Sequence, residues 1–368
     1  VTPDGGGVLE VAGTPGLSDA AQALFAESAL VTIGLTDEFA PLILLCGHGS
    51  TTENNPFASA LDCGACGGNR GASSARVMAA ILNRPEVRAL LAERGIAIPE
   101  ATWVVAGEHD TTTDRVVLLD AELVPAGHRA ALEQLMADLA SAGDGLAAER
   151  ARDLPGAPAG AGAAHVARRS ADWAQVQPEW GLARNAAFVV GPRSLTQGLD
   201  LGRRTFLHSY DPAGDPGLRS LETILTAPMV VAHWINTQYY FSTVDPGRLG
   251  AGDKVTHNVV ARAGVVQGVG GDLRVGLPLQ SLFDDGQPFH EPVRLLTVVQ
   301  APQSALDEVI GRNPVLQELF DGGWVHLAAR DDAGAPWHLR RRDGSWVPWR
   351  PAETIDRAAE AQGGVHHG

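Results

Sequence analysis

The sequence predicts an α/β fold, in which helices pack against a parallel or mixed sheet. Short apolar runs typical of buried strands alternate with helix-like segments along the first part of the chain. The clearest strand is residues 42–46, a continuous apolar run between Pro41 and Gly47. The clearest helix is residues 18–30, which Ser18 can cap through its hydroxyl. The 368 residues are enough for one or two domains with sizeable cores.

The remaining elements follow from the same signals. Further helices are predicted at residues 73–83, 85–94 and 127–141, and within 305–320 on either side of Pro314. Further strands are predicted at residues 102–106, 115–120, 188–190 and 293–300. Gly, Ala and Pro dominate residues 154–164, which indicates a flexible linker or an exposed hairpin. Aromatic residues become frequent beyond it, so we divide the chain into residues 1–153, the linker at 154–164 and an additional α+β region at 165–368.

The composition disfavours several classes of function. Hydrophobic residues make up 45% of the chain and charged residues 19%, which is typical of a globular protein. The formal net charge of −15 argues against binding to nucleic acid, because a phosphate backbone would be repelled. No apolar stretch reaches the ~18–20 residues that a membrane-spanning helix needs. The three cysteines lie close together, which fits thiols kept reduced in the cytoplasm better than a disulfide framework.

All the cysteines belong to a glycine-rich segment around the end of the first strand. It contains Cys46, His48, Cys63 and Cys66, with glycines at positions 47, 49, 64, 67 and 68. Packing in a core does not call for so many glycines, whereas a loop that approaches a ligand closely does. A thiolate and an imidazole suit Zn²⁺ better than Mg²⁺ or Ca²⁺, so we expect zinc. A redox pair formed by Cys63 and Cys66 is one alternative, and a cysteine nucleophile with His48 as its base is another.

A second polar segment follows the strand predicted at 102–106. Glu108, His109 and Asp110 bring two carboxylates and an imidazole together there. At the end of a strand these side chains could support a metal site or relay protons, and a solvated turn is the alternative. The full set of candidates for this supporting role is Cys66, Asp62, Glu108, His109 and Asp110.

Other candidates are weaker. Residues 268–272, Gly-Val-Gly-Gly-Asp, lack the Lys-Ser/Thr and the full glycine spacing of a phosphate-binding loop. His233, His257 and His290 are expected to be polar residues satisfied within the fold rather than ligands.

Several longer strings are specific enough to indicate a family. They are His-Gly-Ser at 48–50, Asp-Cys-Gly-Ala-Cys-Gly-Gly at 62–68, Gly-Glu-His-Asp-Thr-Thr-Thr-Asp at 107–114, Phe-Leu-His-Ser-Tyr-Asp at 206–211 and Thr-Ala-Pro-Met-Val-Val-Ala-His-Trp-Ile-Asn at 226–236. With similar strings over most of the chain, they resemble the DabA family, the peripheral subunit of a bacterial energy-coupled inorganic carbon transporter.

The resemblance implies a zinc site similar to that of β-type carbonic anhydrases. In the family a Cys-x-Asp pair from the N-terminal half and a His and a Cys from the C-terminal half bind the metal, and the latter fall on His48 and Cys63. No Cys-x-Asp-x-Arg segment occurs here, so the chain looks like an incomplete, C-terminal portion of a DabA protein. The missing part would supply two ligands and a catalytic Asp–Arg pair. Residues 1–153 would then form a β-carbonic-anhydrase-like region with half of the zinc site.

The function that the resemblance implies is vectorial conversion of CO₂ to bicarbonate within a transporter. The implied partners are a DabB-type proton-conducting membrane subunit and the missing N-terminal part of DabA. The implied location is the cytoplasmic side of the cell membrane, as a peripheral protein. A soluble β-type carbonic anhydrase without transport and a non-catalytic assembly fragment are the alternatives. We expect the isolated chain to be inactive, because two ligands of four hold zinc weakly.

Overall fold

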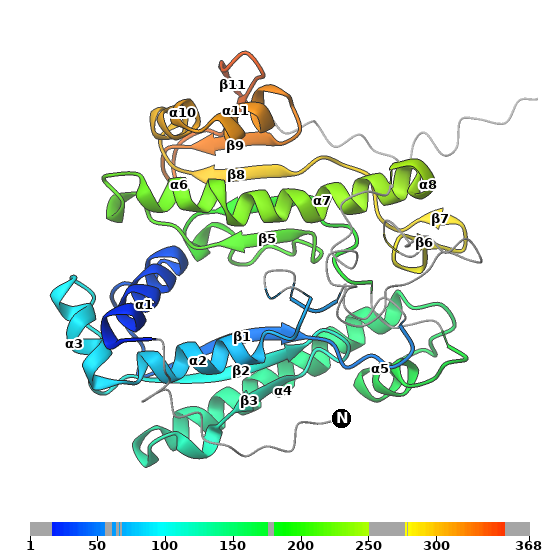
Figure 1. Cartoon of the computed structure of the whole chain (residues 1–368). Helices are drawn as coiled ribbons and strands as arrows, with labels where there is room; N and C mark the ends of the chain where they lie inside the picture. The colour runs from blue at the N-terminus through cyan, green and yellow to red at the C-terminus, as the bar shows by residue number, and fades with distance from the viewer. Residues whose placement is uncertain are drawn as a thin grey trace, which may run out of the picture.

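The computed structural model describes residues 17–349 apart from 56–60, 64–65, 67, 176–179, 250–276 and 278. Residues 268–272 and His257 therefore lie outside the described residues. Two sheets covered by helices make up most of the described part (Figure 1), which confirms the predicted α/β class with a mixed sheet. A closer likeness to β-type carbonic anhydrases stays a prediction. No helix in the described part of the chain has both the length and the apolar character needed to cross a membrane.

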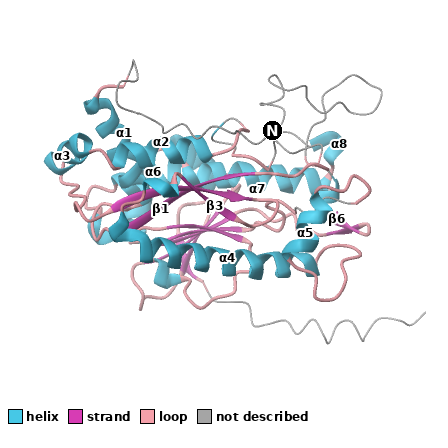
Figure 2. Cartoon of the chain, turned by 90° about the horizontal axis from the view of Figure 1, so that it is seen from below, coloured by secondary structure: helices cyan, strands magenta, loops and turns pink. Residues whose placement is uncertain are grey.

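The first sheet has the strand order β1-β2-β3, with β1 parallel to β2 and β3 antiparallel to β2. Its strands are β1 (Leu42–Gly49), β2 (Trp103–Asp110) and β3 (Val116–Leu119). Its helices are α1 (Asp19–Ile33), α2 (Ala72–Leu82), α3 (Pro85–Glu93) and α4 (Arg129–Arg152). Figure 2 shows α2 and α4 on opposite sides of the strands.

The apolar run of β1 explains why helices cover both faces of this sheet. Ile43 and Leu45 pack with α1, α2 and α3, whereas Leu42 and Leu44 pack on the side of α4. Successive side chains of a strand point to opposite faces, so a continuous apolar run needs cover on both. Ser18 caps α1 through its hydroxyl oxygen, as predicted.

The second sheet has the strand order β11-β10-β9-β8-β4-β5, and its strands from β9 to β5 are parallel. These strands are β4 (Ala187–Val190), β5 (Thr205–His208), β8 (Leu296–Gln300), β9 (His326–Arg330), β10 (His338–Arg340) and β11 (Trp346–Pro348). The helices that share its core are α6 (Arg219–Thr226), α7 (Pro228–Val244), α10 (Gln303–Arg312) and α11 (Pro314–Asp321). Smaller elements are α5 (Ala163–Ser170), α8 (Pro246–Leu249), β6 (Phe283–Asp284) and β7 (Gln287–Pro288).

The first two strands extend further than the sequence predicts. They continue through their polar ends to Gly49 and Asp110, so the polar segments lie partly on strands rather than on loops. Glycine makes the close packing there possible, because a Cβ at Gly47 would lie 2.6 Å from the carbonyl of Gly71. The start of α2 therefore rests directly on the end of β1.

The C-terminal part differs more from expectation. The helical segments on either side of Pro314 are confirmed as α10 and α11, but the sequence missed α5, α6, α7, β5 and the strands after α11. The segment at 154–164 leads from α4 into α5, and Leu154 at its start is buried against Val166. The division of the chain at this segment stays a prediction.

Two glycines of α4 allow a matched test of its packing. A Cβ at Gly143 would lie 2.6 Å from the carbonyl oxygen of Asp114, whereas a Cβ at Gly145 would meet nothing within 4 Å. Alanine is roughly 0.5–1 kcal/mol better than glycine in a helix interior where there is room. We predict that Gly145→Ala raises the free energy of unfolding by this amount and that Gly143→Ala lowers it by about 1–3 kcal/mol. Urea unfolding followed by circular dichroism measures both, and equal effects would contradict the close approach.

Candidate functional site

The two polar segments meet at the carboxyl ends of β1 and β2. The parallel register pairs Gly47 with Glu108, His48 with His109 and Gly49 with Asp110. Paired residues of neighbouring strands point to the same face, so the imidazoles of His48 and His109 lie side by side. Alternation places them on the face that α4 covers. The structure thus brings together two candidates that lie far apart in the sequence.

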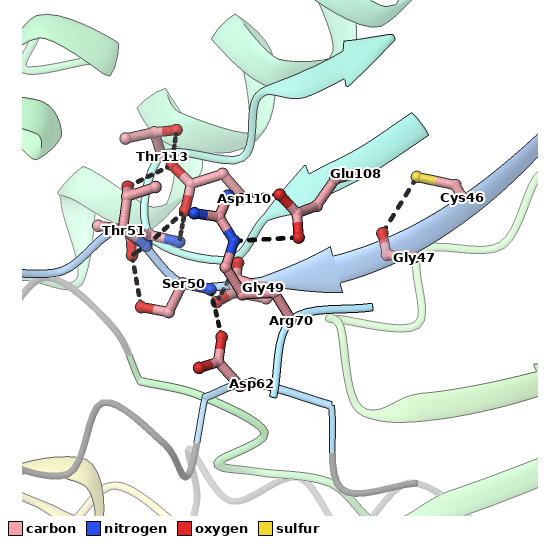
Figure 3. Close-up of polar contacts among 12 residues, drawn as sticks. Cys46, Gly47, Gly49, Ser50, Thr51, Asp62, Arg70, Glu108, Asp110 and Thr113 are labelled. Carbon is pink, nitrogen blue, oxygen red and sulfur yellow. Dashed lines mark hydrogen bonds and ion pairs between the residues drawn. The ribbon is translucent and has the colours of Figure 1, made fainter. Parts of the chain in front are cut away.

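The loop that carries Cys63 returns to the end of β1. The backbone N–H of Ser50 donates to Oδ1 of Asp62 at 2.7 Å (Figure 3). The N–H of Gly71 donates to the carbonyl of His48 at 2.8 Å. Within the loop, the N–H of Cys63 donates to the carbonyl of Asn69 at 3.1 Å. The loop is therefore tied to β1 on both sides of Cys63, which holds this cysteine beside the end of the strand.

The three cysteines differ in their surroundings, although all have free thiols. Cys46 is exposed, and its thiol donates to the carbonyl of Gly47 at 3.3 Å. Loss of hydration, together with the nearby Glu108 carboxylate, raises the pKa of the Cys46 thiol, which disfavours the thiolate that a metal needs. Sγ of Cys66 lies 3.7 Å from Oγ of Ser74 at the start of α2.

Asp110 holds the turns after both strands. Its carboxylate accepts hydrogen bonds from the N–H of Thr51 at 3.1 Å and the hydroxyl of Thr51 at 2.7 Å. It also accepts from the N–H of Thr112 at 3.1 Å and the hydroxyl of Thr113 at 2.5 Å. Figure 3 shows these side chains gathered around the carboxylate. Asp110 is buried and its oxygens are engaged, so its geometry suits a structural support.

Glu108 points to the opposite face from His109 and forms an ion pair with Arg70. Nε of Arg70 donates to Oε1 at 3.1 Å, and Nη2 of Arg70 contacts Oε2 (Figure 3). Glu108 is buried, and the hydrogen bond to it raises the pKa of Arg70. The pair joins β2 to Arg70, two residues before the start of α2 at Ala72.

His109 belongs to a chain of polar contacts that the sequence did not reveal. Its Nε2 lies 3.1 Å from Oδ1 of Asp114, and Oδ2 of Asp114 lies 2.5 Å from Nη2 of Arg150. Arg150 also donates to the carbonyls of Thr111 at 3.0 Å and Thr112 at 2.7 Å. Asp114 is the last residue of the string at 107–114, and Arg150 lies beyond residue 141, the predicted end of its helix. No pattern in the sequence indicates that these two residues contact each other.

A cavity of about 500 Å³ opens beside these imidazoles. His48, His109, Asp114 and Arg150 line one side of it. The residues that line the other side include Phe206 of β5 and Ile235, Gln238 and Tyr239 of α7. The cavity therefore lies between the carboxyl ends of β1 and β2 on one side and β5 and α7 on the other. Its apolar walls meet a polar end that carries two imidazoles.

The other two described histidines of the sequence analysis lie within the fold. His290 is fully buried, and its Nδ1 accepts from the N–H of Arg184 at 2.8 Å. Burial, with a smaller contribution from Arg204, lowers the pKa of His290 to about 4. Burial likewise lowers the pKa of His233. Both are therefore neutral at pH 7.

The ion pair between Asp114 and Arg150 can be compared with a surface pair nearby. The Asp114 side chain is 2% exposed and that of Arg150 11%, whereas Asp144 and Arg115 form a pair that is 60% and 45% exposed. Removing one partner of a buried pair costs about 3–5 kcal/mol, and surface pairs contribute about 0–1 kcal/mol. We predict that Asp114→Asn lowers the free energy of unfolding by about 3 kcal/mol, while Asp144→Asn changes it by about 0.5 kcal/mol or less. Chemical denaturation measures both variants, and a neutral Asp114→Asn would mean that the contact network does not stabilise the fold.

Comparison with known proteins places these features in a family. A family model described as "Probable inorganic carbon transporter subunit DabA" matches residues 4–325. The chain is 50% identical over 352 residues to a protein of that name from Salinibacter ruber, covering 94% of this chain and 43% of the relative. It is 50% identical over 332 residues to a relative from Legionella pneumophila, covering 90% of this chain and 43% of the relative. The chain thus spans about two fifths of the length of these relatives, and no solved structure matches it. On this evidence the chain belongs to the DabA family.

Proposed function

We propose that this chain is part of a subunit of an energy-coupled inorganic carbon transporter, in which a zinc site converts CO₂ to bicarbonate. The observation that carries the proposal is the meeting of His48 and the Cys63 loop at the end of β1, beside a cavity. The relatives that are 50% identical to this chain are named as probable inorganic carbon transporter subunits, which suggests the substrate class.

The residues present fit zinc in kind but supply only half of a site. An imidazole from His48 and a thiolate from Cys63 are donors that zinc prefers. Within the described residues no group of three or more His, Cys, Asp and Glu side chains could hold a metal ion. We propose that the remaining ligands and a catalytic Asp–Arg pair come from the part of the DabA protein outside this chain. When bound, zinc would supply a nucleophile at neutral pH by lowering the pKa of water from 15.7 to about 7.

The surrounding residues of this chain have separate tasks in the proposal. His48 and Cys63 hold the metal, and Asp62 and Asp110 fix the backbone that carries them. The apolar walls of the cavity suit CO₂, which has no charge and no net dipole. His109, held by Asp114 and Arg150, stands at the polar end of the cavity and is our candidate for moving a proton away.

The proposal also includes partners and a location. A DabB-type proton-conducting membrane subunit would couple hydration to the proton gradient and make it vectorial. The chain would then work as a peripheral protein at the cytoplasmic side of the cell membrane. A soluble β-type carbonic anhydrase would need no such partner, and a non-catalytic assembly fragment would hold no metal even in the completed protein.

The choice between the two cysteines of the loop can be tested by metal content. The family resemblance assigns the ligand role to Cys63. The thiol of Cys66 instead contacts the hydroxyl of Ser74. In the completed protein, we predict that Cys63→Ser loses zinc, because metal binding needs each thiolate ligand, and that Cys66→Ser keeps most of it. Elemental analysis of the purified variants is the measurement. The opposite pattern would transfer the ligand role to Cys66.

Whether zinc binding and CO₂ hydration need the rest of the DabA protein can be tested by supplying that part. We predict that the isolated chain binds zinc weakly and shows no measurable CO₂ hydration, because two protein ligands leave the metal largely hydrated. Co-expression with a chain that carries the Cys-x-Asp-x-Arg segment should give stoichiometric zinc and a complex that purifies together. Stopped-flow hydration assays with and without the membrane subunit then separate a transporter from a soluble anhydrase. Tight zinc binding by these 368 residues alone would overturn the half-site.

A further inference from the structure

The outer edge of β1 pairs with no strand in the described part of the chain. Among the described residues, β1 is the outermost strand of its sheet and pairs on one side, with β2. Trp103 donates to the carbonyl of Pro41 and Thr111 donates to the carbonyl of Gly49, so the odd-numbered residues of β1 bond to β2. In a parallel ladder the N–H and C=O of the alternate residues then point away from the partner. On β1 these are Leu42, Leu44, Cys46 and His48.

Most of these outward groups have no partner within the described residues. The carbonyl of His48 accepts from the N–H of Gly71, which closes the edge at that end. No backbone hydrogen bond joins Leu42, Leu44 or Cys46 to a described residue on the outward side. Within the described residues, the outward backbone groups of residues 42–46 can therefore accept another strand, whereas the carbonyl of His48 is already bonded. This difference limits the register of any strand that pairs there.

The side chains along this edge are also incompletely covered. Leu42, Ile43, Leu44 and Leu45 are apolar and only half-buried, although both faces of β1 carry helices. Parallel strands with apolar residues on both faces normally lie inside a sheet, and an exposed apolar edge invites pairing with another strand. An added strand would satisfy the outward backbone groups and cover these side chains at once.

The rest of the DabA polypeptide is the occupant that the observations favour. The chain matches 43% of the Salinibacter ruber relative, which leaves 57% (100 − 43) of that protein outside the matched region. A segment of the same polypeptide reaches the edge at a high effective concentration, whereas a second copy must find it by diffusion. We propose that an extended segment from this remaining part pairs with residues 42–46 of β1 and becomes an additional strand of the first sheet.

Amide hydrogen exchange tests the proposal without any substitution. In the isolated chain the N–H groups of Leu44 and Cys46 should exchange fast, while those of Ile43 and Leu45 exchange slowly. Co-expression with the unmatched part of the Salinibacter ruber relative should slow Leu44 and Cys46 at least tenfold and leave Ile43 and Leu45 unchanged. Unchanged exchange of Leu44 and Cys46 in a stable complex would overturn the proposal. Protection that instead rises with the concentration of the isolated chain would assign the edge to a second copy and overturn the named occupant.

A pair of substitutions at one position provides the second test. Cys46 is exposed and its N–H points outward, so proline there removes an outward donor and leaves the ladder to β2 intact. Cys46→Ala is the control, because it removes the thiol and keeps the N–H. We expect Cys46→Ala to bind the remaining part like the parent chain and Cys46→Pro to bind at least tenfold more weakly, with equal circular dichroism and melting of the two variants. Equal binding by both would overturn the proposal, and if Cys46→Pro fails to fold, the exchange measurement decides.

Discussion

The parallel register of β1 and β2 is the constraint on which the candidate site depends. Because side chains alternate along a strand, a slip of one residue would move His48 from the cavity to the opposite face. Close contacts oppose such a slip, since a Cβ at Gly107 would lie 2.9 Å from a methyl group of Leu44. Gly47 and Gly71 fix the start of α2 against the same strand. Gly47, Gly71 and Gly107 therefore help to fix the register of the strands through close packing.

The carboxylates near the site are already engaged within the fold. Glu108 pairs with Arg70, Asp114 pairs with Arg150, and Asp110 accepts from the backbone and hydroxyls of neighbouring threonines. Buried charges need such partners, because an isolated carboxylate in a dry interior is costly. The oxygens of these carboxylates are thus engaged within the fold, so in the proposed zinc site this chain would contribute the imidazole of His48 and the thiolate of Cys63. A nitrogen and a sulfur ligand of this kind would suit zinc better than Mg²⁺ or Ca²⁺.

The sequence predicts the local elements of the first region well and the long-range contacts poorly. Apolar runs and caps identify β1, α1 and both helices around Pro314, because these signals act over a few residues. The register that places His48 beside His109 depends on backbone pairing between distant segments, which no local pattern encodes. The ion pair between Asp114 and Arg150 could not be predicted from the sequence for the same reason, since thirty-six positions (150 − 114) separate the two residues. The helix α7 buries polar residues such as Asn236 and Gln238 together with apolar ones, so it shows no amphipathic period to recognise.

The proposed zinc half-site and the proposed strand pairing at β1 would be coupled by thermodynamics. Metal ligands on two segments bind more tightly once the segments are held together, so a strand that docks on β1 raises the affinity for metal if it positions further ligands. Linkage then requires that bound metal strengthens docking by the same factor. A site divided in this way would remain weak until the polypeptide is assembled, because each part would supply only two of the protein ligands. Assembly would then control the chemistry directly, since the proposed reactive site would form only where the two parts meet.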